Sequence, residues 1–149
     1  MTATMPAQPA SRPTTRPPQR LFPCLAYQDA PAAIAWLGKA FGFEQMVAYT
    51  GPDGGIVHAE LRLEGNVVML GGERPDHYPV QSPATLGAPT QGVYVCVAAV
   101  DALWERAVAA GAAVVRPLAD THYGSREFSV RDPEGHVWSF GTYDPFAGH

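Results

Sequence analysis

Two residues with acid–base chemistry stand two positions apart in one alternating segment. His58 and Glu60 belong to residues 56–63, in which apolar and polar residues alternate. Ala59 and Leu61 have the opposite parity, so the two polar residues share one face of a predicted strand. A histidine beside a carboxylate is the pair that an oriented general base requires. The same pattern is typical of a solvated sheet face, and both interpretations stay open.

Three further residues could bind a ligand, and each has an ordinary structural alternative. Arg126 can clamp an anionic group or pair with a neighbouring acid. Cys24 can line a cleft or fill the core as a small hydrophobe. Tyr94 can form the aromatic wall of a binding site or pack inside the protein. For Cys24 the sequence favours the core, because no nearby cation or helix N-terminus is evident; for Arg126 and Tyr94 both roles stay open.

The composition favours one folded unit and excludes several classes of partner. The chain has 149 residues, of which 46% are hydrophobic and 16% charged, enough for a core. Its net charge is −4 and it has no basic stripe, so neither nucleic acid nor a membrane is expected as a partner. Two cysteines are too few for a disulfide scaffold. We therefore expect one soluble, cytoplasmic globular unit.

Residues 1–20 differ from the rest of the chain. They contain five prolines and three arginines, and they have no acidic residue. Such a segment cannot bury enough apolar surface to offset its loss of entropy, so a disordered tail is predicted. It has no continuous apolar stretch of the kind found in a secretory signal. The folded domain is expected over residues 21–149.

The elements that position the candidate residues follow one order, which occurs twice. Residues 21–28 form a short apolar strand, and Asp29 can cap a helix over 30–41 that ends at Gly42. Residues 72–90, polar and rich in proline and glycine, are long enough for a linker or a lid. The other predicted elements are strands over 44–49, 56–63, 67–71, 92–98, 113–117, 128–131 and 136–142, and a helix over 101–110.

The two halves of the chain match residue by residue. The sequence EGNVVMLG at 64–71 aligns with EGHVWSFG at 134–141, an offset of 134 − 64 = 70 residues. Such a match indicates a duplication. The predicted fold is therefore α+β, with module one at 21–71 and module two at 91–145. These tandem βαβββ modules are expected to form curled mixed sheets around a cleft, the natural place for a ligand.

Several of these segments resemble a known family. The sequence RDPEGHVW at residues 131–138 resembles the terminal motif of the vicinal oxygen chelate superfamily, which includes glyoxalase I, extradiol dioxygenases, fosfomycin-resistance enzymes and bleomycin-binding proteins. YGSRE at 123–127 is similar to the preceding loop in bleomycin-resistance-like members. IVHAEL at 56–61 resembles a glyoxalase-like branch. The resemblance covers about residues 21–145 and implies the two-module fold and a homodimer.

The resemblance also implies where a metal would be held. In metal-dependent members, the ligands come from the first and last strands of each module. The matching positions here are Phe22, Met69, Gly92 and Ser139, again 70 apart in pairs (92 − 22 and 139 − 69). These residues do not supply the nitrogen and oxygen ligands that a catalytic divalent metal needs. We expect no metal and no other cofactor.

Two classes of function follow. The first is a metal-free binding protein of the glyoxalase and bleomycin-resistance type that sequesters an aromatic or cationic compound, for example an antibiotic. The alternative is a lyase- or isomerase-type enzyme acting on a small metabolite without a metal. Metal-dependent glyoxalase or dioxygenase chemistry is the least compatible with the sequence. The predicted ligand-binding residues are Phe22, Cys24, His58, Glu60, Met69, Tyr94, Arg126 and Ser139.

Overall fold

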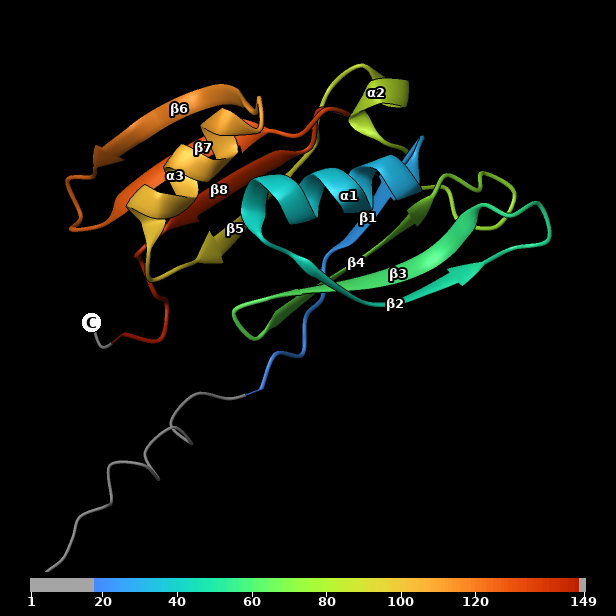
Figure 1. Cartoon of the computed structure of the whole chain (residues 1–149), viewed down its shortest axis with the longest axis horizontal. Coiled ribbons are helices and arrows are strands. Elements are labelled where there is room, and N and C mark those ends of the chain that lie inside the picture. Colours follow the sequence, from blue (N-terminus) through green and yellow to red (C-terminus); the bar gives the residue numbers. More distant parts are fainter. Residues whose placement is uncertain (1–17, 148–149) are drawn as a thin grey trace, which may run out of the picture.

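Two four-stranded sheets lie next to one another in a computed structural model that describes residues 18–147 (Figure 1). In each sheet the first strand pairs with the fourth in parallel, and the remaining pairs are antiparallel. The first sheet has the order β1-β4-β3-β2, with β1 at Cys24–Tyr27, β2 at Glu44–Thr50, β3 at Ile56–Leu63 and β4 at Asn66–Gly72. The second has the order β5-β8-β7-β6, with β5 at Gly92–Cys96, β6 at Ala113–Asp120, β7 at Arg126–Arg131 and β8 at Val137–Gly141.

This topology confirms the predicted α+β fold of two βαβββ modules, each with its own mixed sheet. The curling of the sheets around one common cleft stays a prediction. The predicted tail at 1–20 falls mostly outside the described residues. Its last part includes Gln19, whose side-chain amide donates to the carbonyl of Val67 at 2.9 Å and accepts from its N–H at 2.8 Å. The contacts of module one therefore begin before residue 21.

Helix α1 (Ala30–Phe41) has the bounds that its sequence predicts, because both ends carry strong local signals. The carboxylate of Asp29 accepts a hydrogen bond from the backbone N–H of Ala32 at 3.1 Å. At the other end Gly42 has a φ of 89°, a conformation that side-chain-bearing residues rarely adopt. The helix therefore begins and ends at the residues that the sequence predicts.

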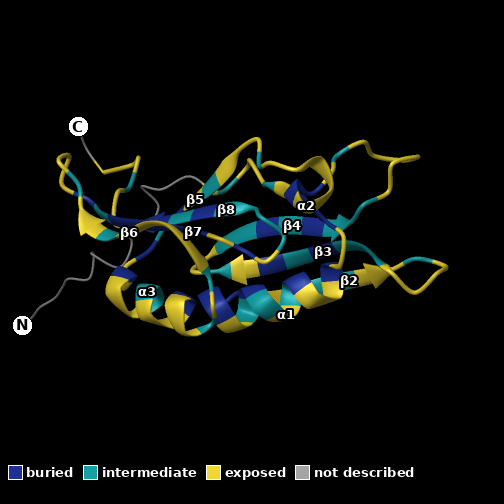
Figure 2. Cartoon of the chain, turned by 90° about the horizontal axis from the view of Figure 1, so that it is seen from above, coloured by how far each residue is buried: buried dark blue, intermediate teal, exposed yellow. Residues whose placement is uncertain are grey.

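Helices α1 and α3 (Val100–Ala109) pack against one another and lie on the same side of the two sheets (Figure 2). The guanidinium of Arg106 donates to the carbonyls of Lys39 at 2.8 Å and Gly38 at 2.9 Å, near the end of α1. Aromatic rings continue the contact, since Phe41 of module one lies 4.6 Å from Phe140 of module two between ring centroids. One core therefore spans both modules. No helix within residues 18–147 is long and apolar enough to cross a bilayer.

A buried aspartate also joins the modules. Asp132 is 4% exposed, and one of its oxygens accepts from the Tyr27 hydroxyl at 2.6 Å and from the Trp138 indole at 3.1 Å. Burial, with the nearby Asp132 carboxylate, raises the pKa of Tyr27 well above its ordinary value. The next acid along the chain, Glu134, accepts from the backbone N–H groups of residues 28 and 29, just before α1. The RDPEGHVW segment thus binds the start of module one.

The segment between the modules contains a short helix that the sequence patterns did not predict, α2 (Pro83–Leu86). Four residues are too few to show helical periodicity. The carboxylate of Glu73 accepts from the Ser82 N–H at 2.8 Å and from the Thr85 hydroxyl at 2.7 Å. These hydrogen bonds lower the pKa of Glu73. They hold α2 next to the end of β4.

Candidate functional site

Each sheet has one face covered by the helices and one face on the opposite side. On β3, Ala59 and Leu61 are buried in the core, whereas His58 and Glu60 have the opposite parity. The opposite faces of the two modules correspond, because the parallel pairs Cys24–Met69 and Tyr94–Ser139 are related by 70 residues. We define the module-one face by Cys24, His58, Glu60 and Met69, and the module-two face by Tyr94, Glu127, Ser129 and Ser139.

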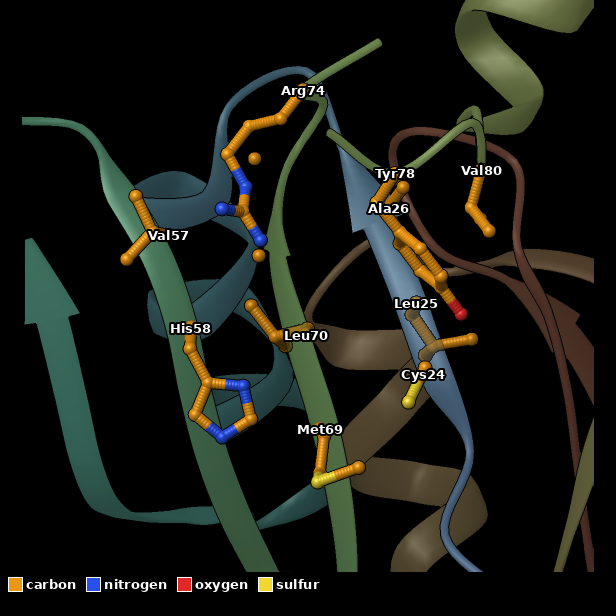
Figure 3. Close-up of a pocket in the computed structure, with 12 residues that line it drawn as sticks. Cys24, Leu25, Ala26, Val57, His58, Met69, Leu70, Arg74, Tyr78 and Val80 are labelled. Carbon is orange, nitrogen blue, oxygen red and sulfur yellow. The ribbon is translucent and has the colours of Figure 1, made fainter. Parts of the chain in front are cut away.

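The module-one face carries a small cavity of about 90 Å³ (Figure 3). Cys24, His58 and Met69 line it from three adjacent strands. The segment after β4 adds Arg74 and Tyr78, whose side chains point back over the sheet. Sheet and linker together therefore form this pocket.

His58 is oriented by a carboxylate. Its Nε2 lies 2.9 Å from an oxygen of Glu60, and its ring stacks on Tyr49 with a centroid distance of 6.1 Å. A carboxylate accepts, so Nε2 carries the proton in this contact, and Nδ1 of the neutral ring is then the basic nitrogen. This arrangement is suited to proton transfer by Nδ1.

The module-two face is built around a nearly buried carboxylate. The side chain of Glu127 is 8% exposed and accepts a hydrogen bond from the Tyr123 hydroxyl at 2.7 Å. Arg116 lies at the rim, 4.0 Å from Glu127, and donates to the Ser129 hydroxyl at 3.0 Å. That hydroxyl is 2.6 Å from the hydroxyl of Ser139. A polar network therefore crosses strands β6, β7 and β8.

Three tyrosines line a cavity on the module-two face, and this cavity has a volume of about 730 Å³. Measured between ring centroids, Tyr94 lies 6.5 Å and Tyr123 lies 6.1 Å from Tyr143. Both ring pairs have an edge-to-face geometry. Burial is the main reason that the pKa of Tyr94 is raised to about 12. The hydrogen bond to Glu127 raises the pKa of Tyr123. Tyr94 and Tyr123 therefore stay neutral at physiological pH.

Gly141 on β8 makes room for this arrangement. A Cβ at this position would lie 2.5 Å from Cγ of Glu127 and 2.9 Å from the hydroxyl of Tyr94. Any larger residue would displace the Glu127 side chain from its place across the strand. Its equivalent in module one, Gly71, is crowded by backbone instead, with the Val57 carbonyl 2.5 Å from such a Cβ.

The structure brings six of the eight predicted ligand-binding residues to the two faces. Cys24, His58, Glu60 and Met69 form the module-one face, and Tyr94 and Ser139 belong to the module-two face.

Phe22 and Arg126 join neither group. Phe22 is 41% exposed and precedes β1. Arg126 forms ion pairs with Asp101 at 2.8 Å and Asp120 at 3.1 Å, which raise its pKa. The acid-pairing alternative for Arg126 therefore describes its contacts in the structure.

The paired positions on the first and last strands of each module do not carry the ligands that the family's metal-dependent members have on those strands. The first-strand positions were expected at Phe22 and Gly92, but in the sheet register Met69 is opposite Cys24 and Ser139 is opposite Tyr94, two residues further along each strand. These four side chains offer two sulfurs, a phenol and a hydroxyl, not imidazoles and carboxylates. Among residues 18–147 there is no group of three or more His, Cys, Asp or Glu that could hold a metal ion.

Sequence reasoning missed residues that reach the faces from outside the predicted strands. Glu127 lies one residue before the strand predicted over 128–131, although its parity matches Ser129. It occupies the place of His58 at an offset of 69, a signal that the repeat contained. Arg74, Tyr123 and Tyr143 come from segments whose folding back onto the sheets no local pattern shows. Arg116 lies inside the strand predicted over 113–117, but the register of β6 against β7 is irregular on both sides of it, so alternation did not show which face it takes.

Two tandem βαβββ modules with pocket-bearing faces define a protein of the vicinal oxygen chelate fold, which typically binds small molecules. A sequence profile of the Glyoxalase/Bleomycin resistance protein/Dioxygenase superfamily matches residues 20–140. The chain belongs to this superfamily. The resemblance seen in the sequence is thereby confirmed.

Individual relatives support the same assignment. An uncharacterized protein of Mycobacterium bovis is 41% identical over 123 residues, which cover 81% of each chain. The crystal structure of TioX from Micromonospora sp. ML1 is 36% identical, covers 83% of this chain and 94% of its own, and has a TM-score of 0.66. A glyoxalase-related enzyme from Fulvimarina pelagi shares the fold at 23% identity, with a TM-score of 0.60 and coverages of 83% and 86%.

Proposed function

We propose that this protein binds a small organic cation with an aromatic part on the module-two face, and that it does so without a metal. The observation that carries the proposal is the nearly buried carboxylate of Glu127 among Tyr94, Tyr123 and Tyr143. Sequestration of such a compound is the function that this geometry supports best.

The physical argument concerns an incompletely compensated charge. A carboxylate that is 8% exposed has lost most of its hydration and gains from a cationic partner. One hydrogen bond from Tyr123 and a distant contact with Arg116 compensate it in part. Tyrosine rings attract a cation through their faces and stack on an aromatic group. Arg116 is 60% exposed, so a ligand can displace it at little cost.

The finer proposal includes a homodimer. Both faces are open in the single chain, and large apolar side chains beside them are exposed, among them Tyr49 at 57% and Phe146 at 61%. A second copy that covers these surfaces would exclude water from both pockets. Light scattering during size-exclusion chromatography, with and without ligand, tests this association; a monomer at all concentrations would contradict it.

The binding proposal is tested by calorimetric titration with benzylamine, which is protonated at neutral pH, and with benzyl alcohol as its neutral counterpart. Benzylamine should bind at least tenfold more tightly than the alcohol. Glu127→Gln should remove that preference, because a hydrogen bond to a charged group contributes about 1.5–3 kcal/mol. Glu60→Gln, the matched change on the module-one face, should leave it intact. Equal binding of both compounds, or an unchanged preference in Glu127→Gln, would overturn the proposal.

A second candidate function is catalysis by proton transfer on the module-one face. The 2.9 Å contact between His58 and Glu60 beside a cavity favours a lyase- or isomerase-type reaction in which Nδ1 of His58 removes a proton from carbon. NMR in D2O with a panel of small ketones, aldehydes and 2-oxo acids would detect hydrogen exchange next to the carbonyl. Exchange that is lost in His58→Asn supports an enzyme; no exchange with any compound contradicts this candidate.

A further inference from the structure

Arg74, in the segment after β4, presents a guanidinium to the module-one pocket. Its side chain points from that segment into the pocket toward the sheet (Figure 3). Within residues 18–147, no hydrogen bond or ion pair engages this guanidinium. Other arginines of the same region are paired, as Arg62 is with Glu44 at 3.3 Å. A planar cation with five donors is thus available at the pocket.

His58 provides a second available polar atom in the same cavity. Its Nε2 is bonded to Glu60, and among the described residues Nδ1 has no hydrogen-bond partner. Protonated His58 would donate from Nδ1, whereas neutral His58 would accept there. Arg74 and His58 therefore form two sides of a polar corner in the pocket.

The rest of the pocket is apolar. Val57, Leu70 and Val80 line it beside the thioether of Met69, and Tyr78 adds an aromatic ring. A ligand that fits this lining has an apolar body next to its polar group. The small volume of about 90 Å³ limits the enclosed part of that ligand to a few heavy atoms.

We infer that the module-one pocket binds the carboxylate of a small apolar acid, with Arg74 as the residue that holds the carboxylate. The guanidinium fork matches a carboxylate in two parallel hydrogen bonds, which a neutral amide cannot reproduce. This inference does not rest on the proposed cation site, because it concerns the other module and the opposite charge. It assigns a role to Arg74 and to the 72–90 segment.

The acidic side chains near Arg74 are either hydrogen-bonded to other residues or line a different cavity. Glu60 is bonded to His58, and Glu73 to Ser82 and Thr85. Asp29 and Asp53 line a neighbouring cavity that Arg74 also borders. A guanidinium that turned toward those aspartates would leave the module-one pocket without its cation. The experiment must therefore detect that alternative.

The test is an NMR titration of the full chain with benzoate, and with benzamide as the neutral isostere, following the ring protons of His58. Benzoate should shift these signals and bind at least tenfold more tightly than benzamide. Arg74→Gln should weaken benzoate binding at least tenfold, and Arg74→Lys should restore only part of it because the fork is lost. Arg62→Gln is the control, because Arg62 on β3 is paired with Glu44 and does not line the pocket; this variant should leave benzoate affinity unchanged.

Three results would overturn the inference: benzoate that leaves the His58 signals unmoved, benzamide that binds as well as benzoate, or an unchanged affinity in Arg74→Gln. The last result is the one expected if Arg74 faces Asp29 and Asp53. Benzylamine is titrated in parallel into the same proteins and into Glu127→Gln. Failure at one module is therefore distinguishable from failure at the other.

Discussion

The open faces of the two modules occupy equivalent places and carry opposite chemistry. His58 on β3 corresponds to Glu127 on β7, and Cys24 on β1 to Tyr94 on β5. Module one presents an imidazole and receives Arg74, whereas module two presents a nearly buried acid surrounded by tyrosines. In this duplicated fold the two modules share one backbone arrangement, whereas their ligand-facing side chains differ.

The physical reason is that the two sides of each sheet are under different constraints. Side chains that face the helices must fill a shared core at close packing, and Phe128, Val130, Trp138 and Phe140 are fully buried there. The side chains that define the opposite faces are not part of this hydrophobic core, so their size and charge are less constrained by its packing. Segments beyond the sheets then complete each pocket differently.

The largest effect is expected from a substitution that removes a contact between the two modules. Asp132→Ala leaves the Tyr27 hydroxyl and the Trp138 indole without their acceptor inside the core. We expect a loss of about 2–5 kcal/mol in the free energy of unfolding, measured by urea denaturation. Asp76→Ala, at an exposed position of the 72–90 segment, is the control and should change it by less than about 0.5 kcal/mol. Equal stabilities of the two variants would show that the aspartate contact does not join the modules.

The equivalent glycines should respond differently to the same substitution. Gly71→Ala directs a Cβ against the backbone carbonyl of Val57, which cannot move away, so a cost of about 1–3 kcal/mol in stability is expected. Gly141→Ala meets the Glu127 side chain, which can rotate. That variant should lose less stability and lose most of its benzylamine affinity. Calorimetry and urea denaturation of both variants measure the two effects; identical profiles would remove the distinction between the faces.

Tyr94→Ala sharpens the comparison on the module-two side. Loss of the ring should weaken benzylamine binding by about 0.5–2 kcal/mol, the range of a cation–π contact. Tyr78→Ala is the counterpart on the module-one side and should affect benzoate alone. Each variant is titrated with both compounds. A Tyr94→Ala protein with wild-type benzylamine affinity would place that ring outside the cation site.

The smallest effect concerns the segment that completes module one. The pKa of Glu73 is lowered below its ordinary value of 4.5 by hydrogen bonds from Ser82 and Thr85. A depressed pKa means that these bonds stabilise the fold above about pH 4.5, and that this contribution is lost as the pH falls through the lowered pKa. Glu73→Gln should reduce stability by less than about 1 kcal/mol, and only above that pH. The pH dependence of the Ser82 amide resonance measures this directly; a resonance that does not titrate would refute the contact.

Much of the architecture could be predicted because its signals are local. Asp29 and Gly42 mark the ends of α1, and the match between 64–71 and 134–141 gives the duplication. Alternation correctly separated the two faces of β3. The prediction failed where a strand extends beyond its apolar core, as at Glu127, and where a segment folds back from outside the sheet, as at Arg74.

By itself, the sequence determined the two-module fold, the separation of core from ligand-facing positions, and the family. The fold and the two faces follow from periodicity, capping and a repeated motif, all of which act over a few residues or one offset, whereas the family follows from the resemblance of segments such as RDPEGHVW to known members. Only the tertiary structure decided which polar residues meet. It paired Arg126 with Asp101 and Asp120, and it gathered three tyrosines around Glu127. Such contacts depend on how distant segments pack, and no local pattern records that.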